Sequence, residues 1–270
     1  MHVGIVAQRD NVRAARLADE IRRHVDASVS IDERTAATLG DDGIAVEALD
    51  TCDLVVSIGG DGTFLFAARE VSPTPLIGVN LGEVGFLNVV SPSDAVETIR
   101  TEIERFRAGT ATYQELPQVQ AFGDDWTLPP AVNEVSVFGP QRGRENGLGT
   151  EVRVDGALYT GGHADGVLVA TATGSTAYNL SEGGPLVHPD VSAFVITEMC
   201  ADDPMPPLAV SLDAEIGIRV EDADRAFVVA DGRTRETLDP PASVTVRRGD
   251  DPVRIAGPPL EFFSALGKLG

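Results

Sequence analysis

The first part of the chain alternates short apolar runs with segments in which apolar residues recur at helical spacing. This pattern predicts strands near 2–8, 28–31, 54–58 and 75–80, helices near 11–25 and 63–71, and a charged helical segment over 92–108. Strands that alternate with helices form a parallel sheet covered by helices. Residues 1–108 are therefore predicted to be an α/β domain with a parallel sheet.

From Thr112 onward the pattern changes to short strands without intervening helices. Strands are predicted near 132–138, 151–159, 166–171, 193–198, 214–220, 226–230 and 243–248, with a hairpin turn at Asp155-Gly156. Residues 109–251 should form a mainly antiparallel β domain. The segment 252–270 contains a short amphipathic helix near 257–266, and we expect this segment to return to the first domain.

The loop after the third predicted strand carries the strongest chemical signal. Residues 54–58 are apolar, and Gly59, Gly60, Asp61, Gly62 and Thr63 follow directly before a helix. Free backbone N–H groups and the positive end of the helix dipole suit a phosphate there, and glycines let it approach closely. A carboxylate beside a phosphate is unfavourable unless it binds a metal ion or takes a proton from a nucleophile. The loop therefore predicts phosphoryl transfer with Asp61 as the catalytic group.

A simpler interpretation is a tight strand-to-helix turn with Asp61 as an ordinary helix cap. A cap needs one such residue and does not account for three glycines around it. The spacing differs from the dinucleotide loop G-x-G-x-x-G, and no G-K-[ST] follows, so this is not a P-loop. Lys268 is the only lysine in the sequence.

Composition narrows the choice of partners. The formal net charge is −21 and the pI is about 4.4, which disfavours nucleic acid and anionic membranes. Acidic residues are spread along the chain, which is typical of a protein from a halophilic source, although an acidic mesophilic enzyme is the alternative. An acidic chain that binds polyphosphate needs a cation, so we expect Mg²⁺ or another divalent ion, together with backbone N–H groups, to compensate the phosphate charge. With two cysteines and neither a leader nor an apolar span, we predict a soluble cytoplasmic protein.

A second cluster of small polar residues follows Asp165. The segment 165–185 runs from an apolar strand into T-A-T-G-S-T-A-Y-N-L-S-E-G-G-P. Small residues let a flat ligand lie close to the backbone, and hydroxyls can bind ribose and amide groups. A structural Ser/Thr turn explains the spacing equally well.

Four motifs together resemble the NAD kinase family. They are G-G-D-G-T at 59–63, G-E-V-G-F-L at 82–87, N-E-V at 133–135 and T-G-S-T-A-Y at 173–178, in an order that matches along nearly the whole chain. The first motif is shared with diacylglycerol, sphingosine and phosphofructokinase-type enzymes, whereas T-G-S-T-A-Y with the downstream G-G-P is more selective. The resemblance implies the NAD kinase/diacylglycerol kinase-like fold and a homodimer or homotetramer.

The resemblance also implies an activity: phosphorylation of the 2′-hydroxyl of the adenosine ribose of NAD, with ATP or polyphosphate as donor, to give NADP. Asp61 matches the catalytic aspartate, and Gly59, Gly60, Gly62 and Thr63 match the phosphate-binding turn. The positions implied to bind NAD are Asp61, Gly62, Phe86, Leu87, Asn133, Glu134, Arg144, His163, Asp165, Thr173, Thr176, Ala177, Tyr178, Asn179, Leu180, Ser181 and Asp231. For three of these positions a structural role explains the residue about as well as a ligand role does. Arg144 would then be a surface arginine, His163 a turn histidine, and Asp231 with Gly232 a hairpin turn.

The chain departs from the family pattern at three places. Ala172 stands where proline is usual, Asn88 replaces a common threonine, and Asp202 and Asp203 stand where many members have a His-Ser pair. Two alternatives to NAD kinase therefore stay open: a kinase of a lipid or sugar hydroxyl, and a non-catalytic sensor of pyridine nucleotides.

Overall fold

The computed structural model describes residues 1–82, 85–141, 143 and 147–267. The chain forms two compact units, one of Met1–Leu116 with Pro252–Gly270 and the other of Pro117–Asp251. The division follows Leu116, whereas the sequence pattern placed it after residue 108. Each unit is described separately below.

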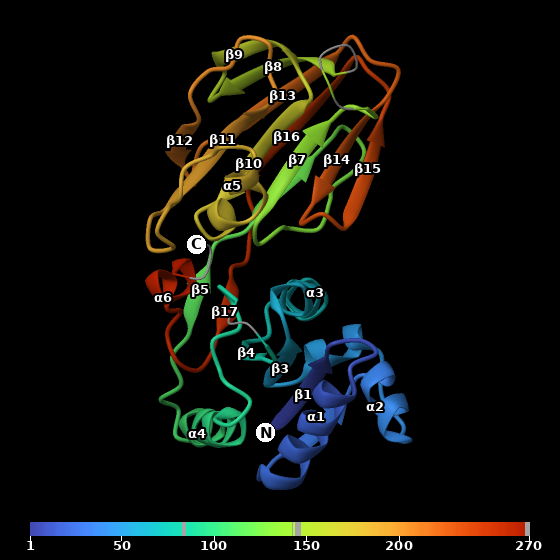
Figure 1. Cartoon of the computed structure of the whole chain (residues 1–270), viewed down its shortest axis with the longest axis vertical. Coiled ribbons are helices and arrows are strands. Elements are labelled where there is room, and N and C mark those ends of the chain that lie inside the picture. Colours follow the sequence, from blue (N-terminus) through green and yellow to red (C-terminus); the bar gives the residue numbers. More distant parts are fainter. Residues whose placement is uncertain (83–84, 142, 144–146, 268–270) are drawn as a thin grey trace. The chain divides into compact units, whose positions relative to one another are not determined.

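The first unit is an α/β layer around a mostly parallel sheet (Figure 1). Its strands lie in the order β2-β1-β3-β4-β17-β5, and only β5 runs antiparallel to its neighbour among these pairs. In chain order the elements are β1 (His2–Ala7), α1 (Val12–His24), β2 (Ser28–Ile31), α2 (Glu33–Leu39), a 3₁₀ helix (Val46–Thr51), β3 (Leu54–Gly59), α3 (Asp61–Val71), β4 (Leu76–Asn80), α4 (Ala95–Arg107), β5 (Gln114–Leu116), β17 (Val253–Ile255) and α6 (Phe262–Leu266).

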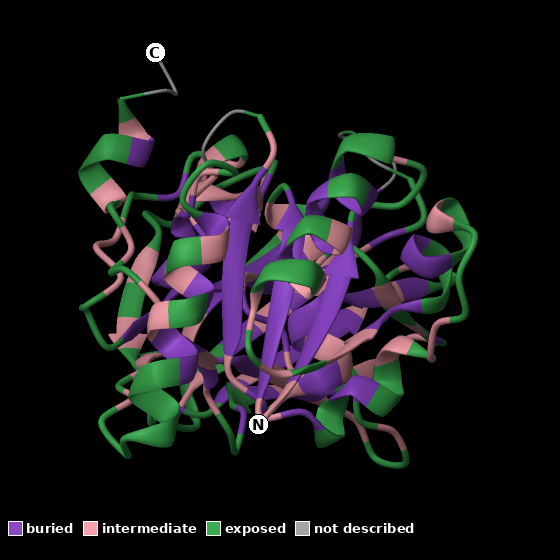
Figure 2. Ribbon diagram, turned by 90° about the horizontal axis from the view of Figure 1, so that it is seen from below, coloured by how far each residue is buried: buried purple, intermediate pink, exposed green. Residues whose placement is uncertain are grey.

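Hydrophobic periodicity explains how the helices of this unit pack. Ala14, Leu17, Ala18 and Ile21 are buried on one face of α1, at the spacing expected for a helix that covers a sheet. All six residues of β3 are buried, as in a strand covered on both faces. The buried strands and the exposed outer faces of the helices are visible in Figure 2. Asn11 begins α1 as its N-cap, because its side chain accepts the N–H groups of Arg13 and Ala14.

The second unit consists of two antiparallel sheets, ordered β12-β11-β10-β7-β14-β15 and β6-β16-β13-β8-β9. Its elements are β6 (Val119–Phe122), β7 (Glu134–Phe138), β8 (Leu148–Val154), β9 (Ala157–Ala164), β10 (Gly166–Thr171), a 3₁₀ turn (Thr173–Thr176), α5 (Tyr178–Ser181), β11 (Ala193–Met199), β12 (Leu208–Ser211), β13 (Ile216–Glu221), β14 (Ala226–Ala230), β15 (Thr234–Leu238) and β16 (Ala242–Arg248). Apolar residues of both sheets, such as Val137, Val169, Ile218 and Val246, form one buried core.

These observations confirm the predicted fold class. The Asp155-Gly156 hairpin turn is also present, with φ of 49° and 80° at the two residues. Elements α2, β12, β15 and β17 were not predicted. The start of α3 was predicted wrongly, because the helix begins at Asp61 and not at residue 63. Asp61 therefore lies in the first helical turn, with Gly60 as the N-cap.

No helix in the described part of the chain combines the length and the apolar character needed to cross a membrane.

Candidate active site

The predicted phosphate-binding turn lies where β3 ends and α3 begins. A Cβ at Gly59 would come within 2.5 Å of the Thr63 hydroxyl, so glycine is required there by close packing. Gly60 differs, because a Cβ there would meet no atom of the other described residues within 4 Å and its φ of −96° is ordinary for any residue. Neither packing against the described residues nor backbone strain explains this glycine. The open space at Gly60 borders the N-terminus of α3, where backbone N–H groups favour an anion.

The carboxylate of Asp61 is bound by the chain segment that follows β4. Backbone N–H groups of Phe86, Leu87 and Asn88 donate to it at 2.8, 3.1 and 3.3 Å. The Asn88 side-chain amide donates to the same carboxylate at 3.4 Å. A Cβ at Gly85 would lie 2.0 Å from the Asp61 Oδ1, so only glycine lets this segment come so close. Asp61 is therefore held in one orientation and is not a helix cap.

The two oxygens of this carboxylate are used unequally. Oδ1 accepts from Leu87 and from both nitrogens of Asn88, while Oδ2 accepts from Phe86 among the described residues. A carboxylate oxygen offers two lone-pair sites. Oδ2 is thus the oxygen better placed to accept a further hydrogen bond or a proton.

Two residues outside the predicted site support this segment. Asn88 is fully buried, and a Cβ at Gly78 of β4 would lie 2.3 Å from its side-chain oxygen. The ring of Phe86 packs against Phe262 of α6, with centroids 6.1 Å apart. Neither residue was predicted to belong to the site. Asn88 stood out in the sequence only because the NAD kinase family commonly has threonine at this position, and Phe262 only because it lies in the predicted amphipathic helix.

In the second unit, Asp231 binds the segment that contains Asn133 and Glu134. Its carboxylate accepts the backbone N–H groups of Val132, Asn133 and Glu134 at 2.8, 2.8 and 3.2 Å. The Asp231 N–H donates to the Glu134 carbonyl at 3.0 Å. The predicted hairpin turn is present between β14 and β15, with φ of 46° at Asp231 and 64° at Gly232.

Glu134 is a buried acid. Its exposed fraction is 6%, and Oε2 has no hydrogen-bond partner among the described residues. Burial raises the pKa of its carboxyl to about 8, the negative charge of Asp231 adds to the rise, and the Tyr178 backbone N–H partly offsets it.

The hydroxyl-rich segment packs against the same residues. The Thr171 N–H donates to the Asn133 carbonyl, and the Thr171 hydroxyl donates to the Val132 carbonyl. A Cβ at Gly174 would lie 2.0 Å from the Asn133 carbonyl oxygen. Asn133, Glu134, Gly174 and Tyr178 are thus brought together, and their role in binding NAD stays a prediction.

Other members of the segment serve the fold. Asn179 is fully buried, and its amide binds the carbonyls of Ser175 and Pro185 and the hydroxyl of Thr197. Ser175 is also buried and exchanges hydrogen bonds with the backbone of Val187. The other predicted ligand positions of this segment differ in exposure. Thr173 is buried, Ser181 is exposed, and the partly exposed positions are Thr176, Ala177, Tyr178 and Leu180.

Asp165 and His163 lie at the start of β10 and in β9. The Asp165 carboxylate accepts the Gly143 N–H at 2.7 Å, and its exposed fraction is 5%. His163 lies 3.8 Å from the Asp202 carboxylate, one of the two acids that replace the family His-Ser pair. Arg144, the other predicted basic residue, lies outside the described residues.

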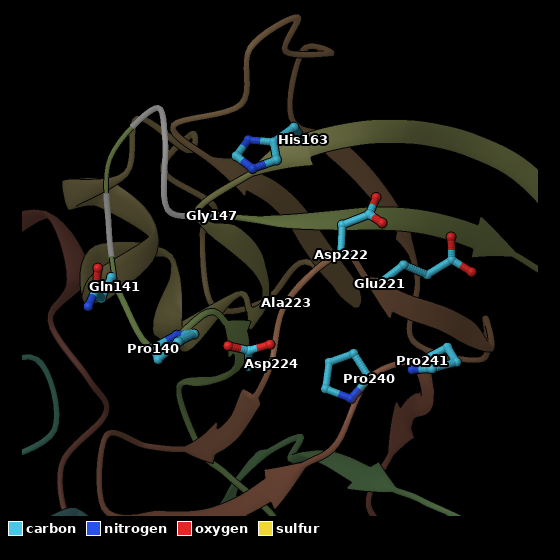
Figure 3. Close-up of a pocket in the computed structure, with 10 residues that line it drawn as sticks. All are labelled: Pro140, Gln141, Gly147, His163, Glu221, Asp222, Ala223, Asp224, Pro240 and Pro241. Carbon is cyan, nitrogen blue, oxygen red and sulfur yellow. The ribbon is translucent and has the colours of Figure 1, made fainter.

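His163 lines a cavity of about 750 Å³ in the second unit (Figure 3). The described residues that line it are Pro140, Gln141, Gly147, His163, Glu221, Asp222, Ala223, Asp224, Pro240 and Pro241. Three of these side chains are acidic, so this described part of the lining does not suit an anion. The cluster around Glu134 does not contribute to this lining.

The described residues contain no group of three or more His, Cys, Asp or Glu side chains that could hold a metal ion. Mg²⁺ commonly binds through one or two carboxylates plus substrate phosphates. The residues present therefore fit a metal ion that is held mainly by a polyphosphate, not by a dedicated protein site.

Both units match models of one protein family. Residues 7–106 match the ATP-NAD kinase N-terminal domain, and residues 132–257 match the ATP-NAD kinase C-terminal domain.

Similar proteins point the same way. The chain is 65% identical over 269 residues to the NAD kinase of Natronomonas pharaonis and 56% identical over 281 residues to that of Halobacterium salinarum, with 100% of each chain covered in both comparisons. Both are halophilic archaea, which fits the acidic composition.

Solved structures agree. The crystal structure of an NAD kinase from Archaeoglobus fulgidus in complex with ATP is similar with a TM-score of 0.80 and 26% identity, covering 100% of this chain and 98% of that one. Yeast NADH kinase complexed with NADH has a TM-score of 0.83 at 20% identity, covering 100% of this chain and 87% of that one, and supports the fold alone. The chain therefore belongs to the NAD kinase family.

Proposed function

We propose that this protein transfers the γ-phosphoryl group of ATP to the 2′-hydroxyl of the adenosine ribose of NAD, giving NADP and ADP. The observation that carries the proposal is the Asp61 carboxylate, fixed by four hydrogen bonds at the start of α3, next to the open space at Gly60. Family membership supplies the choice of substrates.

Asp61 acts as the general base in this proposal. The ribose hydroxyl donates to Oδ2, the oxygen with fewer donors, and gives up its proton there as its oxygen attacks the γ-phosphorus. The bond between the γ-phosphorus and the oxygen that bridges the β- and γ-phosphates breaks, and ADP leaves. The backbone N–H groups at the start of α3 and the open surface of Gly60 bind the phosphates. Divalent metal neutralises phosphate charge when bound, and it is brought by the nucleotide.

The second unit supplies nucleotide recognition. Asn133, Glu134, Tyr178 and the partly exposed residues Thr176 and Ala177 are the proposed NAD-binding positions. Asn179 contributes indirectly, because its amide holds the turn in which these residues lie. The acidic cavity at His163 is not assigned to a phosphate-bearing part of the substrate.

The test is a product analysis with the purified protein in concentrated KCl. Incubation with NAD, ATP and Mg²⁺ should give NADP and ADP in equal amounts, with the new phosphate at the 2′ position by mass spectrometry and ³¹P NMR. Parallel reactions with polyphosphate, and with sugar and lipid acceptors, identify the donor and the acceptor. Formation of a phosphosugar or phospholipid without NADP would contradict the proposal.

Asp61→Asn tests the catalytic assignment. The amide retains the size of the side chain but cannot take a proton, so kcat should fall by roughly 10²-fold or more, while NAD binding stays near the wild-type level. A variant with normal turnover would remove Asp61 from the role of general base.

A further inference from the structure

Glu134 has a buried oxygen that its own unit does not satisfy. The residue begins β7, between β10 and β14 in the six-stranded sheet, and is 6% exposed. Oε2 lacks a hydrogen-bond partner among the described residues. An ionised carboxylate with a buried oxygen that lacks a donor is strongly unfavourable in free energy, whereas a neutral acid has an O–H that needs only an acceptor. The geometry thus favours the protonated form with its O–H free.

Among the groups around Glu134, the charge of Asp231 also favours the protonated form, whereas the Tyr178 N–H opposes it. Ala170 of β10 lies opposite in register and carries no charge, and α5 contributes the Tyr178 N–H. The turn between β14 and β15 contributes the negative Asp231 and, two residues later, the exposed Arg233. A second anion beside a buried carboxyl disfavours its ionisation.

The Asp231 carboxylate accepts hydrogen bonds from three backbone N–H groups. Its three N–H donors, from Val132, Asn133 and Glu134, are the kind of partners that suit a carboxylate anion. They fix the start of β7, and the Asp231 N–H closes the arrangement on the Glu134 carbonyl. Asp231 can therefore determine where the Glu134 side chain lies without touching a ligand.

We propose that Glu134 binds the nucleoside as a neutral acid that donates a hydrogen bond from Oε2, and that Asp231 is the positioning residue that holds it. The ligand atom is an acceptor, such as a ring nitrogen of a purine or a ribose oxygen. This inference rests on the proposed binding of NAD. It replaces the expectation that Asp231 itself contacts NAD with a role that acts through Glu134.

A pH dependence follows from the proposal. The pKa of Glu134, raised to about 8, keeps the acid protonated at neutral pH. Above this pH the acid ionises and loses its donor, so binding should weaken as the pH rises. Glutamine in its place is a permanent neutral donor and should remove the dependence.

The first experiment is titration calorimetry of the full chain with NAD alone, from pH 6 to pH 9.5 in concentrated KCl. Wild-type affinity should be constant up to about pH 8 and then fall, by up to about tenfold per pH unit. Glu134→Gln should bind within roughly threefold of the wild-type affinity at pH 6.5 and keep that affinity at pH 9.5. Glu134→Ala, the matched variant without a donor, should bind at least roughly tenfold more weakly than Glu134→Gln at every pH.

Asp231→Asn separates positioning from contact. The amide keeps the size and one acceptor oxygen but removes the charge, so the pKa of Glu134 should fall and the loss of binding should begin at a lower pH. A uniform loss of affinity with an unchanged pH profile would identify Asp231 as a ligand contact and contradict its positioning role. A wild-type profile that is flat from pH 6 to pH 9.5, or a Glu134→Gln variant that binds more than roughly tenfold more weakly at pH 6.5, would overturn the neutral acid.

The second experiment does not depend on NAD. Between pH 4.5 and about 8 the folded chain holds a proton on Glu134 that the unfolded chain has lost, so this group makes the folded state less stable as the pH rises. Glu134→Gln lacks this effect, and its denaturant midpoint should rise relative to that of the wild type from pH 5 to pH 8. A constant difference would overturn the neutral acid even if NAD binds. If the denaturant midpoints change with pH as expected but NAD does not bind, the proposed substrate is rejected and the neutral acid is retained.

Discussion

The two units use the same hydrogen-bonding pattern at two aspartates. Asp61 accepts the N–H groups of residues 86, 87 and 88, and Asp231 accepts those of residues 132, 133 and 134. In each case three consecutive backbone donors hold one carboxylate, at distances between 2.8 and 3.3 Å. Each aspartate thus joins a segment distant in sequence to its own turn.

What lies beside each carboxylate differs. Asp61 follows Gly60, which has open space around it, whereas Asp231 lies beside the buried acid Glu134. The first arrangement leaves a fixed base next to room for phosphate. The second places a negative charge where it controls the protonation of its neighbour. A well-bound aspartate therefore does not reveal its function until its surroundings are known.

The largest expected effect comes from Gly85→Ala. The new Cβ would lie 2.0 Å from the Asp61 Oδ1, and a side-chain carboxylate can rotate away from it. The base would lose its position, so kcat should fall by roughly 10²-fold, with little change in the thermal midpoint. Steady-state kinetics and calorimetric melting measure both quantities.

Gly174→Ala is the counterpart in the second unit and sharpens the contrast. Its Cβ would meet a backbone atom, the Asn133 carbonyl oxygen, at 2.0 Å, and a backbone atom directly before the buried strand β7 cannot rotate away as a side chain can. This variant should lose about 1–3 kcal/mol of stability. If Gly85→Ala were the less stable variant, with normal turnover in its folded fraction, the role given to the segment around Asp61 would be wrong.

Gly60→Ala is expected to have the next largest effect. None of the described residues opposes a methyl group there, so folding should be normal, but the methyl would occupy the space proposed for phosphate. The KM for ATP should rise roughly tenfold or more while the thermal midpoint stays within about 1 °C, since only ligand space is lost. Gly217→Ala is the matched control, because the nearest atom to its Cβ, the Arg153 Cβ, lies at 4.0 Å. An unchanged KM for ATP in Gly60→Ala would place the phosphate elsewhere.

Much of the fold was predictable because its signals are local. The buried strand β3, the amphipathic helix α1 and the Asp155-Gly156 turn each follow from adjacent residues. Two short strands were missed for different reasons. The edge strand β15 is mostly polar, and β17 has only three residues, which pair with β4 and β5 far away in the sequence.

The site was predictable in composition but not in contacts. The glycine-rich turn led to the prediction of Asp61 as the catalytic acid, which stays a prediction, yet no motif indicated that residues 86–88 bind its carboxylate. Asn179 looked like a ligand position, whereas its amide is used inside the turn. Such contacts depend on which distant backbone groups reach a side chain, and spacing along the chain does not contain that information.

The smallest expected effect concerns the C-terminal helix and tests how far the support of Asp61 extends. Phe262 packs on Phe86, whose N–H donates to the Asp61 carboxylate at 2.8 Å. Such a ring pair contributes about 0.5–1.5 kcal/mol, so Phe262→Ala should reduce kcat/KM for NAD by roughly three- to tenfold. Phe263→Ala is the comparison variant, because Phe263 is 75% exposed and its ring packs against Phe262 itself, with centroids 5.5 Å apart. Equal losses in the two variants would show that α6 contributes through its general stability, whereas a loss confined to Phe262→Ala would show that the ring pair itself helps to position the segment that binds Asp61.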